Sequence, residues 1–139
     1  MSDDETDSDR TADQLPLEGI RVIDAGTLIA APLAASLLAD FGAEVVTVEH
    51  PDHGDGLRNL DPVKDDVPLW WKVTGRNKEC VTLDLSTDDG ARLFKGLARE
   101  ADVVTENYRP GTMEKWGLGY DELAAENPDL VMLRVSGYG

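Results

Sequence analysis

Short apolar segments alternate with segments of helical periodicity along this chain, and the alternation limits the possible folds more than any other feature. Five segments rich in Val, Ile and Leu predict β-strands at 20–24, 44–49, 80–85, 102–106 and 129–135. Helical spacing of apolar residues falls between them, at about 32–41, 87–98, 112–116 and 121–126. Parallel strands separated by helices are joined by right-handed crossovers. The pattern therefore predicts an α/β fold with helices flanking a mostly parallel sheet.

The acidic composition excludes several classes of function. The 139 residues carry 28 acidic and 13 basic groups, which gives a formal net charge of −15. Such a charge opposes binding to nucleic acid and to anionic membranes. No apolar run reaches the length of a membrane span, about 18 residues, and the acidic start of the chain is unlike a secretory signal. We therefore predict a cytoplasmic protein.

Composition also predicts an acidic tail, an adaptation to salt and a long loop. Residues 1–14 hold five Asp and one Glu, which predicts a disordered acidic tail before a folded part at 15–139. Asp outnumbers Glu by 18 to 10 and Lys is scarce at 5 residues, a bias that suits solubility at high salt. We interpret it as salt adaptation, with an ordinary acidic protein as the alternative. The stretch 50–68, with three prolines and two glycines, predicts a long loop.

Several familiar motifs are absent or weak. The turn after the first strand, DAGTLIAAP, lacks the Gly-rich dinucleotide fingerprint and the P-loop pattern. His50, His53 and Asp55 could bind a metal, but we interpret both imidazoles as solvated loop residues and predict no metal site. The single cysteine, Cys80, excludes a disulfide framework and is interpreted as a buried structural residue. Asp84, within an apolar run, is expected to be hydrogen-bonded.

The few cations stand out in so acidic a chain. Arg76 and Lys78 occur together in GRNK, and Arg109 and Lys115 follow the fourth strand in ENYRPGTMEKWG. Retained cations near the ends of parallel strands suggest an anionic ligand such as a phosphate. Isolated surface ion pairs are the alternative interpretation.

Taken together, five segments resemble the family III coenzyme A transferases, the formyl-CoA transferase and CaiB/BaiF type. They are PLEGIRVIDAGTLIAAP, LLADFGAEVVTVEHPDHGD-x-x-R, NKECVTLDL, ADVVTENYRPGTMEKWGLGYDEL and NPDLVMLRVSGYG, and they cover about residues 15–139. The resemblance implies a Rossmann-like large domain, of which this chain would be an incomplete N-terminal part. It also implies an interlocked homodimer of the full-length protein.

The same resemblance implies a reaction and a set of binding residues. The family transfers coenzyme A from an acyl-CoA donor to a carboxylic acid, through an aspartate expected downstream of the SGYG segment, so this fragment alone is expected to be inactive. Coenzyme A is then a substrate, and no tightly bound cofactor is expected. By motif, the coenzyme A contacts fall on Ile29, Ala30, His50, Leu83, Asp84, Leu85, Ser86, Asn107, Tyr108, Arg109 and Lys115.

Two alternatives remain open at this point. α-Methylacyl-CoA racemases share this N-terminal pattern and act by proton abstraction beside the thioester carbonyl. A coenzyme A-binding or nucleotide-binding module without catalysis is the second. Formyl-CoA transferases resemble this chain but have Gln where Ile29 stands and Arg where His50 stands, which argues against a formyl or oxalate substrate.

Overall fold

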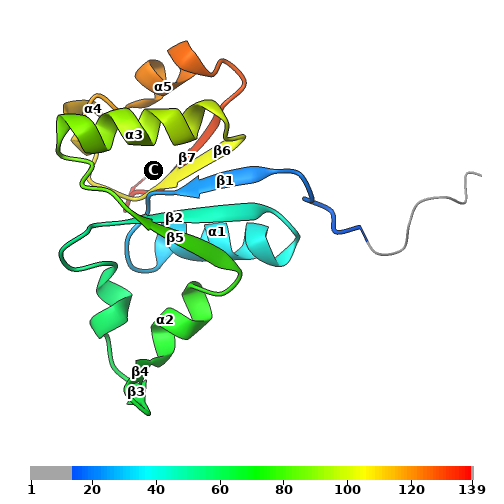
Figure 1. Cartoon of the computed structure of the whole chain (residues 1–139), viewed down its shortest axis with the longest axis vertical. Coiled ribbons are helices and arrows are strands. Elements are labelled where there is room, and N and C mark those ends of the chain that lie inside the picture. Colours follow the sequence, from blue (N-terminus) through cyan, green and yellow to red (C-terminus); the bar gives the residue numbers. More distant parts are fainter. Residues whose placement is uncertain (1–13, 139) are drawn as a thin grey trace, which may run out of the picture.

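The computed structural model of the chain describes residues 14–138, so the tail predicted at 1–14 lies, except for residue 14, outside the described residues. Five parallel strands form one sheet in the order β5-β2-β1-β6-β7, and a small antiparallel hairpin, β3–β4, stands apart from it (Figure 1). The strands are β1 (Arg21–Asp24), β2 (Glu44–Glu49), β3 (Val63–Lys64), β4 (Val67–Pro68), β5 (Lys78–Thr82), β6 (Val103–Glu106) and β7 (Val131–Arg134).

The helices lie on both faces of the sheet, as the alternating pattern predicts. In Figure 1, α3, α4 and α5 cover one face, and α1 covers the other, with α2 beyond it near the hairpin. They are α1 (Ala30–Asp40), α2 (Leu69–Thr74), α3 (Asp88–Arg99), α4 (Thr112–Lys115) and α5 (Tyr120–Glu126), with a 3₁₀ turn, η1 (Gly56–Asn59). The predicted α/β, Rossmann-like fold is confirmed. No helix within residues 14–138 is long and apolar enough to cross a membrane.

The two faces are packed differently because successive residues of a strand point to opposite sides. Toward α3, Ile23 and Val104 join a core with Phe94 and other large apolar side chains. Toward α1, Val22 and Val45 pack against the small side chains of Ala35, Ala39 and Ala43. The α1 face also carries the buried polar residues of the central strands, which are described below.

The strand predicted at 80–85 is displaced along the chain. The observed strand, β5, begins at Lys78 and ends at Thr82, and Leu83 and Leu85 lie in the loop that follows. Leu85 is buried and Leu83 half-buried against the α3 core, so loop packing, rather than strand pairing, explains the apolar run. Leu83 N–H still donates to the carbonyl of Glu49, which continues the ladder by one residue.

The prediction of a long loop at 50–68 is only partly correct. It contains η1 and the β3–β4 hairpin, whose two-residue connection places Asp65 and Asp66 at positive φ. The six-residue helix α2 follows directly and has no side-chain cap at its N-terminus, so no capping signal announces it in the sequence. Helix α3, by contrast, begins with Thr87 accepting from Gly90 N–H at 3.0 Å.

Candidate functional site

The reversal of strand order places a crevice at the carboxyl end of the sheet. The chain runs from β1 outward to β2 and β5, then returns to the other side of β1 to form β6. Ligands of open α/β sheets bind at such a reversal, outside the carboxyl ends of the strands. The loops that follow β1, β2, β5 and β6 therefore form the candidate site.

A cavity of about 250 Å³ lies between these loops. It is lined by six of the eleven residues that the sequence indicated: His50, Leu83, Asp84, Leu85, Ser86 and Tyr108. A second cavity of about 360 Å³ shares Tyr108 and is also lined by Ala30, Asn107 and Arg109. Ile29 and Lys115 line neither cavity, and both side chains are exposed. The structure thus brings nine of the eleven residues together.

The loop after β5 is ordered by Asp84. Its Oδ1 accepts hydrogen bonds from the backbone N–H of Ser86 at 3.0 Å and from the Ser86 hydroxyl at 2.6 Å. These bonds, with the nearby His50 ring, hold the pKa of Asp84 below its usual range. The helix that follows packs closely here, since a Cβ at Gly90 would lie 1.9 Å from the Asp84 carbonyl oxygen. Asp84 is hydrogen-bonded, as expected, although it lies after the strand rather than within it.

Two stacked imidazoles form another wall of the cavity. The rings of His50 and His53 are 4.2 Å apart and parallel within 1°. His50 Nδ1 accepts from Asp52 N–H at 3.2 Å, which directs its Nε2 toward the Asp84 carboxylate, 3.7 Å away. Within residues 14–138, no group of three His, Cys, Asp or Glu side chains is arranged to hold a metal ion.

An aromatic pair closes the side of the cavity next to β6. The rings of Tyr108 and Trp116 meet edge to face, with centroids 5.0 Å apart. Burial, reinforced by the Asp55 and Glu106 carboxylates, raises the pKa of Tyr108 to about 12. Its hydroxyl therefore stays protonated at neutral pH and can donate a hydrogen bond.

The turn between β1 and α1 uses its backbone donors internally. In dinucleotide-binding folds, the N–H groups of this turn face phosphate oxygens. Here three consecutive N–H groups donate instead to side-chain oxygens: Gly26 to Asp24 at 3.0 Å, Thr27 to Asn107 at 2.7 Å and Leu28 to Asp55 at 2.9 Å. Asn107 Nδ2 also donates to the Thr27 carbonyl at 2.9 Å, which joins the loops after β1 and β6.

Glu49, at the end of β2, anchors the adjacent loop. Its carboxylate accepts from Arg58 Nε and Nη2, both at 2.6 Å, and from Asp55 N–H at 2.8 Å. Burial opposes the charged form, but the bonds from Arg58 and Asp55 outweigh it, and the pKa of Glu49 lies below its ordinary value. The Arg58 guanidinium lies 3.7 Å above the Trp71 ring. Arg58 ends the HPDHGD-x-x-R segment of the resemblance, but neither Arg58 nor Glu49 was predicted as a functional residue.

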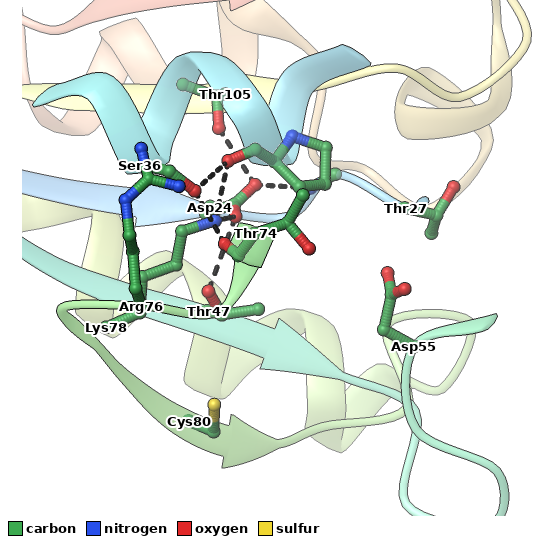
Figure 2. Close-up of polar contacts among 12 residues, drawn as sticks. Asp24, Thr27, Ser36, Thr47, Asp55, Thr74, Arg76, Lys78, Cys80 and Thr105 are labelled. Carbon is green, nitrogen blue, oxygen red and sulfur yellow. Dashed lines mark hydrogen bonds and ion pairs between the residues drawn. The ribbon is translucent and has the colours of Figure 1, made fainter. Parts of the chain in front are cut away.

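Two of the four singled-out cations form ion pairs: the phosphate interpretation is wrong for the buried Lys78, and for Arg76 the alternative, a surface ion pair, is observed. Lys78 is buried beneath α1, with its Nζ 2.9 Å from Asp24 Oδ2 (Figure 2). Arg76 forms an ion pair with Asp40. The interpretation of Cys80 as a buried residue is also wrong, because its side chain is exposed. Cys80 lies on β5, which is an edge strand of the sheet and is therefore less covered than a central strand.

The fold and the site define an α/β protein of the Rossmann type with a cavity at its switch point. Residues 17–139 match the profile of CoA-transferase family III, and the chain belongs to this family. It is 56% identical over 132 residues to the succinyl-CoA–L-malate CoA-transferase beta subunit of Chloroflexus aurantiacus, covering 94% of this chain and 33% of that protein. It is 50% identical to the succinyl-CoA–D-citramalate CoA-transferase of the same organism, covering 89% and 31%.

A solved structure has the same fold. The chain superimposes on the crystal structure of a hypothetical protein from Mycobacterium tuberculosis with a TM-score of 0.83 and 43% sequence identity, covering 90% of this chain and 34% of that one. The chain therefore spans about a third of the length of the relatives it matches.

Proposed function

We propose that this chain supplies the coenzyme A-binding part of an acyl-CoA transferase. The observation that carries the proposal is the convergence of nine residues, indicated by motif, on two cavities that share Tyr108 at the carboxyl edge of the sheet. Those residues come from the start of α1 and from three loops that are distant in sequence. Membership of CoA-transferase family III makes a coenzyme A thioester the substrate to test first.

The lining of the cavities suits the parts of coenzyme A. Leu83 and Leu85 offer apolar surface to the pantetheine arm, and Tyr108 offers a ring and a hydroxyl donor. Arg109 is exposed at the second cavity, where its guanidinium can pair with a phosphate in bidentate geometry. Because the N–H groups of the β1–α1 turn already have acceptors, we expect the phosphates to bind away from that turn.

We further propose the class of acid that the full protein uses. Two relatives at 50% identity or more are named for succinyl-CoA and for malate or citramalate, which are both hydroxy dicarboxylic acids. A small dicarboxylic acid is therefore the acceptor to test first. We propose that the attacking aspartate lies outside residues 1–139, and that two copies of the full protein interlock. The residues described here would bind and orient the thioester.

Calorimetric titration of the purified chain with coenzyme A, at low and high KCl, tests the binding proposal. We expect saturable binding and a rise in melting temperature with ligand concentration. Arg109→Gln is expected to weaken coenzyme A binding by about tenfold, because it removes a charge-assisted contact to phosphate. The same variant is expected to bind pantetheine, which has no phosphate, as the unmodified chain does.

The matched control is Arg92→Gln, which removes the same charge from an exposed position on α3. It is expected to leave the affinity for coenzyme A within about twofold. A folded chain that shows no heat of binding and no thermal shift with coenzyme A would remove the proposal. Equal losses of affinity in both arginine variants would mean that Arg109 acts only through the net charge of the chain.

A further inference from the structure

The β1–α1 turn holds a bulky residue in an unfavourable backbone conformation. Leu28 has φ of +60°, in the left-handed region that Leu rarely adopts because its Cβ approaches the backbone. Its side chain is 48% exposed, so core packing does not impose this conformation. A strained residue persists only where its surroundings fix it. A specific contact must therefore hold Leu28 in place.

Asp55 provides that contact. Its carboxylate is buried and divides its two oxygens between two segments: Oδ1 accepts from Leu57 N–H at 2.7 Å, and Oδ2 accepts from Leu28 N–H at 2.9 Å. The first bond caps η1, and the second crosses to a turn 27 residues earlier in the chain. Figure 2 shows the Asp55 carboxylate directed toward the turn that carries Thr27. Capping η1 needs only one of the two oxygens.

Asp55 is itself held in place by a residue of the sheet. Its N–H donates to Glu49 at the end of β2, and Arg58 clamps that carboxylate with two bonds. The position of Leu28 is thus tied to β2 through the Glu49–Asp55 contact. Both Asp55 and the adjoining turn residue Thr27 line the 250 Å³ cavity, so a change in this bond would alter the cavity wall.

We propose that Asp55 is a positioning residue, which holds the β1–α1 turn in the shape that the coenzyme A cavity requires. The inference rests on the proposed function, because it assigns Asp55 to the same cavity. It adds that the turn is preorganised by a side chain from another loop. Preorganisation of this kind raises affinity by reducing the ordering cost on binding.

Asp55→Asn is the most direct test, since it preserves the volume of the side chain. An amide offers one oxygen, so either Leu28 N–H or Leu57 N–H loses its acceptor whichever way the group is turned. We expect the dissociation constant for coenzyme A, measured by calorimetry on the full chain, to rise about tenfold. Asp129→Asn is the matched control, because Asp129 is exposed and precedes β7, at the opposite edge of the sheet. Its affinity is expected to be unchanged.

A second substitution separates positioning from simple destabilisation. Leu28→Gly removes the steric cost of positive φ, so the turn no longer depends on Asp55 to hold that conformation. We expect Asp55→Asn to weaken binding about threefold or less in the Leu28→Gly background, against tenfold in the unmodified chain. Equal losses in both backgrounds would overturn the proposed action through Leu28.

The remaining outcomes distinguish the two proposals. If the unmodified folded chain does not bind coenzyme A, the proposed function fails. If it binds, and Asp55→Asn lowers the melting temperature without changing the dissociation constant, the function stands and Asp55 is only structural.

Discussion

The two faces of the central sheet are built from the same strands but stabilised by different means. Toward α3, Ile23 and Val104 bury against Phe94, so the stabilisation comes from apolar area removed from water. Toward α1, Asp24 lies at the centre of a polar cluster and is completely buried (Figure 2). Its carboxylate accepts from Thr47 at 3.3 Å and from Lys78 at 2.9 Å.

The register of the strands explains how this cluster forms. Asp24 is paired with Thr47 on one side and with Thr105 on the other, so the three side chains lie in a row across the sheet. Lys78 reaches the row from the edge strand, and its Nζ also donates to the Pro32 carbonyl of α1 at 2.6 Å. The apolar face can be filled by many side chains of suitable volume, whereas the polar face requires every partner.

The largest expected effect tests the apolar face. Phe94→Ala removes a side chain with no exposed surface and leaves a cavity between α3 and the sheet. We expect the free energy of unfolding to fall by about 4 kcal/mol, measured by urea denaturation. Phe94→Leu should recover most of the loss, because an apolar core tolerates a change of shape. If Phe94→Leu were as damaging as Phe94→Ala, the two faces would be equally demanding.

The next prediction tests the polar face. Lys78→Met keeps an unbranched side chain, one atom shorter, but leaves Asp24 buried without its cation, and we expect a loss of about 3 kcal/mol in the same measurement. Asp24→Asn combined with Lys78→Met should be more stable than Lys78→Met alone, since the amide carries no charge and the Thr47 hydroxyl can turn to accept from it. A double variant less stable than the single one would contradict the charge explanation.

The same contrast shows what could be predicted from the sequence. Strand and helix positions follow from local periodicity, and Ser86 and Tyr108 lie at the cavity because the carboxyl ends of parallel strands share one edge. The partner of Lys78, by contrast, lies 54 residues away, and nothing local distinguishes a buried ion pair from a phosphate ligand. The strand predicted at 80–85 was displaced because the apolar run continues beyond β5 into a packed loop. The salt-adapted origin stays a prediction.

The smallest expected effect is at Glu49, whose buried carboxylate can be compared with that of Asp24 on the α1 face. Glu49 is 4% exposed like a core residue, but its partner Arg58 is 39% exposed and accessible to water. Because its pKa in the folded chain lies below the unfolded value near 4.5, the contribution of Glu49 to stability is present above that pH. It is lost as the pH falls through the lowered pKa. We expect Glu49→Gln to cost about 1 kcal/mol at pH 7.

Denaturation from pH 7 to pH 3 provides the measurement. The difference in unfolding free energy between the chain and Glu49→Gln should shrink below pH 4.5, because protonated Glu49 no longer pairs with Arg58. Glu122→Gln, at an exposed position on α5, is the matched control and should follow the unmodified chain throughout. A difference that stays constant down to pH 3 would mean that Glu49 acts by shape and hydrogen bonding, not by charge. Of these two carboxylates, only Asp24 would then require a paired charge, from Lys78.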